Sequence, residues 1–120
     1  MKNTRPYRKP AKTQDLRDAA GRIVLAHGEV TGHHHAVCAA DSATDIADAE
    51  FFEEPDGRRV LLALAPCVLT HPEHGLIVLE PAAPTQVRQG DVLLTPIGPG
   101  AWVVTRQVEY VRGELRTVAD

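Results

Sequence analysis

Apolar and polar residues alternate in short runs along most of the chain, and turn-forming residues separate these runs. Such runs, five to eleven residues long and rich in Val, Leu and Ile, predict β-strands. The longest alternation, "AWVVTRQVEYV", places Trp102, Val104, Val108 and Tyr110 on one face of a strand. The other runs are "RIVLAH", "HHHAVCA", "CVLTH", "GLIVLEP" and "GDVLLTPI".

Two turn signals join neighbouring runs into hairpins. Pro55-Asp56-Gly57 interrupts "EFFEEPDGRRVLLAL", and Arg112-Gly113 precedes the final run "ELRTVAD". The only helical expectation is one or two turns over residues 13–20, "TQDLRDAA", ended by Gly21. Seven or eight short strands therefore predict an all-β fold, a small single-domain β-barrel or sandwich.

Charge is distributed unevenly over the 120 residues, whose formal net charge is −3. Five of the thirteen Lys and Arg residues lie within residues 1–12, which contain none of the sixteen acidic residues. We expect residues 1–15 to form a disordered basic arm and residues 16–120 to form the β-domain. A nucleic-acid partner would have to contact residues 1–12 through its phosphates, and the acidic remainder argues against a dedicated nucleic-acid protein.

No apolar run approaches the ~20 residues of a membrane span, and no hydrophobic segment follows the basic N-terminus. We therefore expect no membrane partner and a cytoplasmic location. The two cysteines, Cys38 and Cys67, do not form a disulfide framework and are expected to act as small buried apolar residues. A thiolate ligand at Cys67, four residues before His71, is the minority alternative.

All six histidines lie between positions 27 and 74, and three of them are consecutive in "GEVTGHHHAV". Strand alternation would point His33 and His35 to the same side, an arrangement that offers two imidazoles to one metal ion. The corner "THPEHG" contributes His71 and His74 from a second segment. We predict that these four histidines converge on a divalent metal, with Glu29 and Glu73 as further ligands or as partners that orient the rings.

The identity of such a metal stays open among zinc, iron, nickel, copper and manganese, because nitrogen ligands suit them all. The alternative is a metal-free polar interior held together by imidazole hydrogen bonds. No catalytic residue is identified, since the chain has no G-x-S-x-G, phosphate-binding loop or dinucleotide motif. A second candidate group, a polar cluster at the end of the long strand, comprises Arg106, Gln107, Glu109 and Tyr110.

The stretch "GEVTGHHH" resembles the first motif of the cupins, small β-barrels that carry H-x-H on a strand after a glycine. Gly28, His33 and His35 match that motif, and His71 or His74 would stand for the second one. The resemblance implies a cupin-like barrel that binds a metal. The chain departs from the cupin pattern because no strand glutamate follows at the expected spacing.

A second resemblance rests on "LAHGEVTGHHHAV", "LTHPEHGLIVL" and "VTRQVEY". Together they look like a group of small uncharacterised bacterial and phage-associated proteins with GEVTGH-x-H, H-x-EHG and QREY-type motifs. The resemblance supports the same candidate residues: Glu29, His33, His35, His71, Glu73, His74, Gln107, Glu109 and Tyr110. It differs in one respect, because "QGDVLL" opens the chain in that group and occupies residues 89–94 here.

The sequence thus predicts a protein with a histidine-rich site that binds a divalent metal, with cupin-like catalysis as an open question. The rival hypothesis is a metal-free interaction or structural module that recruits a partner through the basic arm or an exposed strand edge. We expect a homodimer, since small β-domains with exposed edges often pair.

Overall fold

A computed structural model of the chain describes residues 6–27, 34–41, 45–111 and 114–117, of which positions 27, 108–111 and 114–117 are described by their backbone alone. All regular elements of these residues are β-strands, and every strand pair is antiparallel. No helix in this part of the chain is long and apolar enough to cross a membrane.

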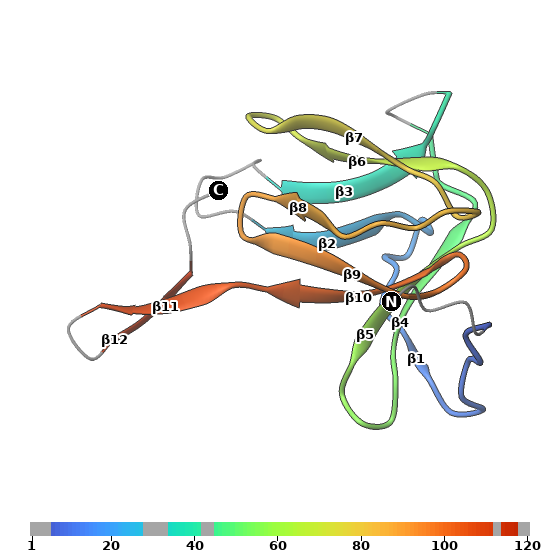
Figure 1. The fold of residues 1–120 in the computed structure, drawn as a ribbon, viewed down its shortest axis with the longest axis horizontal. Helices are drawn as coiled ribbons and strands as arrows, with labels where there is room; N and C mark the ends of the chain where they lie inside the picture. The colour runs from blue at the N-terminus through green and yellow to red at the C-terminus, as the bar shows by residue number, and fades with distance from the viewer. Residues whose placement is uncertain (1–5, 28–33, 42–44, 112–113, 118–120) are drawn as a thin grey trace.

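Two sheets form the body, and a separate hairpin extends from it (Figure 1). The larger sheet has the order β1 (Gln14–Asp15), β4 (Ala49–Glu53), β5 (Arg59–Ala63), β10 (Ala101–Arg106), β9 (Val92–Gly98) and β8 (Val87–Gln89). The smaller has the order β2 (Ile23–His27), β3 (His34–Ala39), β6 (Cys67–His71) and β7 (Gly75–Leu79). The hairpin consists of β11 (Val108–Val111) and β12 (Glu114–Thr117).

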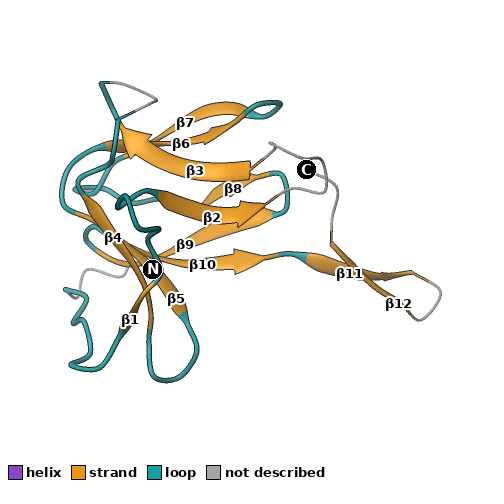
Figure 2. Ribbon diagram, turned by 180° about the vertical axis from the view of Figure 1, so that it is seen from behind, coloured by secondary structure: helices purple, strands orange, loops and turns teal. Residues whose placement is uncertain are grey.

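The hydrophobic core contains residues from both sheets, because alternate positions of their strands are buried. Ile23, Leu25 and Leu69 come from the four-stranded sheet, whereas Leu94 and Trp102 come from the six-stranded sheet. The sheets do not close into a barrel, as both keep free edge strands (Figure 2). The all-β prediction is confirmed, and the closed-barrel alternative is wrong.

The strands of both predicted hairpins pair in the structure, and the turn at residues 112–113 lies outside the described residues. β4 and β5 pair on either side of the turn at Pro55-Asp56-Gly57, where Gly57 adopts a φ of 93° that a side chain would disfavour. The run from Ala101 to Val111 is instead divided into β10 and β11 at Gln107, whose backbone N–H donates to the Asp91 carbonyl. This division, together with the short strands β1 and β8, gives more strands than the seven or eight expected.

The expectation of helical turns over residues 13–20 is wrong. Leu16 donates its N–H to the Phe51 carbonyl and so continues the pairing of β1 with β4. The Asp18 carboxylate then accepts hydrogen bonds from the backbone N–H groups of Ala20 and Arg22. A short polar side chain that binds nearby backbone in this way stabilises a turn in competition with a helix.

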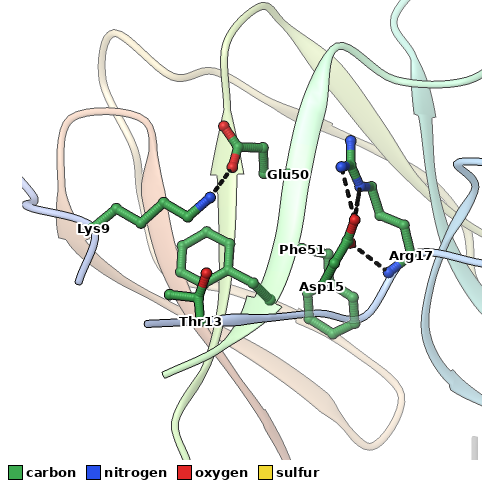
Figure 3. A pocket seen from close by; sticks show the side chains of 7 residues that line it. Lys9, Thr13, Asp15, Arg17, Glu50 and Phe51 are labelled. Atoms are coloured by element: carbon green, nitrogen blue, oxygen red, sulfur yellow. Dashed lines mark hydrogen bonds and ion pairs between the residues drawn. The ribbon is translucent and has the colours of Figure 1, made fainter. Parts of the chain in front are cut away.

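The described part of the N-terminal segment, residues 6–15, lies against β4. The Lys9 ammonium binds the Glu50 carboxylate (Figure 3). It also lies 4.6 Å from the centre of the Phe52 ring. Tyr7 donates its hydroxyl hydrogen to Glu54, and β1 pairs with β4. The basic segment thus contacts acidic and aromatic side chains of the domain, and a domain boundary at residue 15 stays a prediction.

Glu54 gives the fold a testable dependence on pH. Its side chain is 4% exposed, and its oxygens accept hydrogen bonds from Arg58 Nε at 2.6 Å and from the Tyr7 hydroxyl. The Arg58 guanidinium lowers the pKa of the Glu54 carboxyl, and the hydrogen bond from Tyr7 lowers it further. A carboxyl whose pKa is lowered by folding stabilises the fold at pH values above its pKa in the unfolded chain. This stabilisation is lost as the pH falls through its pKa in the folded state.

We expect Glu54→Gln to reduce the free energy of unfolding by about 1 kcal/mol at pH 7. The difference between wild type and variant should shrink as the pH falls below 4.5, the ordinary pKa of a glutamate. Urea denaturation at pH 7 and at pH 4 measures both values. A difference of the same size at the two pH values would contradict the assigned role of the carboxylate.

Candidate functional site

Three histidine rings from two distant segments meet at one end of the space between the sheets. The ring centres of His35 and His71 are 4.4 Å apart, those of His71 and His74 are 4.5 Å apart, and those of His35 and His74 are 6.2 Å apart. His35 lies on β3, His71 is the last residue of β6, and His74 lies in the turn before β7. His35 and His71 are buried, and His74 is exposed.

Both ring nitrogens of His35 face hydrogen-bond acceptors. Nδ1 lies 2.9 Å from Oε1 of Gln89, and Nε2 lies 3.1 Å from Oδ1 of Asp91. All three side chains are almost completely excluded from solvent. An imidazole with a proton on each nitrogen can donate a hydrogen bond to each of these oxygens. An imidazole with a single proton would leave one nitrogen lone pair facing an oxygen lone pair.

The orientation of the Gln89 amide is fixed by the backbone around it. Its Nε2 group donates to the Leu69 carbonyl at 3.2 Å and to the Gly75 carbonyl at 2.9 Å. Because an amide nitrogen donates and cannot accept, the amide oxygen must be the atom that faces His35. The Nδ1 atom of His35 is therefore a donor.

Asp91 links this histidine to a cation on the neighbouring strand. Its Oδ2 atom accepts a hydrogen bond from Arg106 Nε, while Oδ1 faces His35. Asp91 is completely buried, whereas the Arg106 side chain is 32% exposed. Gln89 and Asp91 flank Gly90, which has a φ of 58° at the turn that joins β8 and β9.

His71 helps to form the corner that carries it. Its Nδ1 atom accepts hydrogen bonds from the backbone N–H groups of Glu73 at 3.0 Å and His74 at 3.3 Å. These contacts place the ring proton on Nε2 and hold the turn that starts β7. The exposed Glu73 contributes its backbone to this arrangement.

Other predicted residues take different positions. His33 and Glu29 lie outside the described residues. His34 is half-buried on β3, on the face opposite to His35. The members of the predicted polar cluster are separated in the structure. Arg106 joins the Asp91 network, and the half-buried Gln107 separates β10 from β11. Glu109 and Tyr110 lie in the hairpin that leads away from the body (Figures 1 and 2).

Burial raises the pKa of both cysteine thiols. Cys67 is completely buried, and burial raises its pKa to about 11. Burial also raises the pKa of the half-buried Cys38. A protonated thiol is a poor metal ligand, so this observation favours the expectation of apolar cysteines over a thiolate at Cys67.

Within the described residues, no three or more His, Cys, Asp and Glu side chains are already arranged as a metal cage. What the structure holds is one imidazole–carboxylate pair, His35 with Asp91, and two further imidazoles beside it. Gln89 and Asp91 were not among the predicted site residues. Their only sequence signal is "QGDVLL", whose apolar run predicts a strand.

Residues 4–82 match the family model described as a Domain of unknown function (DUF8820), and the chain therefore belongs to this family. His35, His71 and His74 lie inside the matched region, whereas Gln89, Asp91 and Arg106 follow it. No curated protein and no solved structure matches the chain.

Proposed function

We propose that this protein binds a divalent transition-metal ion at the histidine cluster, with Nε2 of His35 as one ligand and His71 and His74 as the nearest further imidazoles. The observation that carries the proposal is the approach of three imidazole rings to within 4.4–6.2 Å of one another. Imidazole nitrogens are common ligands of zinc, copper, nickel and iron.

The hydrogen bond from His35 Nδ1 to Gln89 supports the choice of Nε2. Histidines that bind metals almost always donate their other ring N–H to an oxygen acceptor, which fixes the ring orientation. Here the acceptor is itself anchored by the carbonyls of Leu69 and Gly75. The Nε2 atom is thereby directed to the side of the ring where Asp91 lies.

His35 Nε2 and Asp91 Oδ1 lie 3.1 Å apart, at hydrogen-bond distance. Two ligands bound at about 2.0–2.2 Å from one tetrahedral metal lie roughly 3.3–3.6 Å apart, so a shared ion requires the pair to lose the proton between them and to separate slightly. Arg106 works against this arrangement because its positive charge already neutralises the carboxylate. We expect Arg106→Gln to strengthen metal binding for that reason.

His71 must change its hydrogen bonds to bind a metal, since its Nδ1 atom accepts two backbone N–H groups. His74 is exposed and can reorient at low cost. From the sequence, His33 remains a proposed ligand, and Glu29 and Glu73 remain proposed additional ligands. The cupin-like interpretation and any catalytic activity belong to this proposal and depend on the metal.

A second candidate function is a metal-free module in which the same residues stabilise the fold. The observation that favours it is that the polar groups of the network have hydrogen-bond partners. Among the described residues, no buried side-chain nitrogen or oxygen lacks one. A network of this kind needs no ion to compensate its buried groups.

Isothermal titration of the untagged protein with zinc, copper and nickel separates the two functions. We expect binding of one ion per chain, weakened by about a hundredfold or more in His71→Ala/His74→Ala. Gln89→Ala should weaken it by about 10- to 100-fold, the usual effect of losing a partner that orients a ligand.

His34→Ala is the matched control, because this residue neighbours His35 and lies on the opposite face of β3. It should leave metal affinity unchanged. Wild-type protein that binds none of these ions, or equal affinity in wild type and His71→Ala/His74→Ala, would favour the metal-free module. Circular dichroism of each variant verifies that it is folded.

A further inference from the structure

The edges of the two sheets differ in how they are protected against pairing with another chain. Natural proteins protect edges with short strands, charged residues or β-bulges. β1 has two residues, one of them Asp15, and β8 has three residues with Arg88 at its centre. β2 is longer, but a register shift between Val24 and Ala26 interrupts its pairing.

β7 has none of these features. It is the outer strand of the four-stranded sheet, and its five residues, Gly-Leu-Ile-Val-Leu, include no charge and no proline. It lies at the periphery of the molecule in both views (Figures 1 and 2). Leu76 is 62% exposed and Val78 is 65% exposed, and strand alternation places them on the same face.

We propose that β7 pairs with β7 of a second copy of this chain about a two-fold axis at Ile77, so that the two four-stranded sheets form one continuous sheet. Strand addition at an exposed edge gains main-chain hydrogen bonds, and the side chains set the register. A second copy is the occupant that the sequence of β7 favours, because the strand is complementary to itself when it runs antiparallel.

That complementarity appears in the register about the axis. Antiparallel pairing centred on Ile77 places Leu76 opposite Val78 of the second copy, and the symmetry repeats this apolar contact. Beyond the strand this pairing ends, because His74 lies in the turn before β7 and its ring is beside those of His35 and His71.

The inference does not depend on metal binding, and it is tested with chelator present. Sedimentation velocity of the untagged chain should show a particle of twice the mass of one chain. Leu76→Lys/Val78→Lys should weaken self-association by about a hundredfold or more, because it places two desolvated cations at each apolar contact. Both positions are exposed, so the fold should be retained, as near-wild-type thermal unfolding would show.

Leu64→Lys is the matched control, since Leu64 is 60% exposed and lies outside β7. It should leave the dimer unchanged. Ile77→Cys gives a second readout, because the register places the two new thiols directly opposite one another, within reach of a disulfide. Oxidation should link two chains in Ile77→Cys and not in Leu64→Cys.

A wild-type monomer would overturn the proposal. So would a dimer that persists in Leu76→Lys/Val78→Lys, or one that forms no cross-link at position 77, because either result would assign the interface to another surface. None of these outcomes affects zinc binding measured on the same proteins, so failure here and failure of the metal site are distinguishable.

Discussion

Asp91→Asn should reduce the free energy of unfolding by about 3 kcal/mol, although it changes one atom of the side chain. The carboxylate is completely buried and faces His35 on one side and Arg106 on the other. Removing one member of a buried ionic network leaves the remaining charges without compensation, which costs about 3–5 kcal/mol. The partial exposure of Arg106 places the effect at the lower end of this range.

Urea denaturation in the presence of chelator measures this loss without a contribution from bound metal. Arg106→Gln is the informative comparison, because it removes the exposed partner and leaves the contact between Asp91 and His35. We expect it to cost about 1.5 kcal/mol, the lower end of the range for a hydrogen bond to a charged group. Equal losses in the two variants would show that the network is not organised around Asp91.

Trp102→Ala should reduce the free energy of unfolding by about 4 kcal/mol. Trp102 is completely buried on β10, which pairs with β5 on one side and with β9 on the other. Truncating a buried tryptophan costs about 3–5 kcal/mol, through lost apolar contacts and the cavity that remains. The total stability of a domain is only about 5–15 kcal/mol, so this is a substantial part of it.

The indole also donates a hydrogen bond from Nε1 to the Thr85 carbonyl at 2.9 Å. Trp102→Phe separates the two contributions, because it keeps most of the apolar volume and removes the donor. We expect this variant to lose about half as much stability as Trp102→Ala, measured by thermal and urea unfolding. A loss below about 1 kcal/mol in Trp102→Ala would mean that the core around β10 is loosely packed.

The strands were accessible from the sequence because their signals are local. Alternation in "AWVVTRQVEYV" places Trp102 and Val104 on one face, and both are buried in the structure. Pro55-Asp56-Gly57 identifies a hairpin from three adjacent residues. The helical expectation at residues 13–20 failed because the Asp18 side chain and the pairing of Leu16 with Phe51 stabilise a different local structure.

The surroundings of His35 were not accessible in the same way. Gln89 and Asp91 reach it across 54 and 56 positions of the sequence, and no local pattern reports a contact of that length. Whether two sheets close into a barrel is likewise decided by edge pairings between distant strands. The sequence did indicate which imidazoles to consider, because His35, His71 and His74 come from the two segments that it singled out.

The most direct test of the proposed metal site is to locate the metal ion in crystals of the untagged protein grown with zinc. Diffraction data collected on both sides of the zinc absorption edge identify the ion by its anomalous signal. We expect one peak about 2.0–2.2 Å from His35 Nε2, with an imidazole nitrogen of His71 or His74 also bound. Crystals in which the zinc peaks avoid His35, while its nitrogens still contact Gln89 and Asp91, would contradict it.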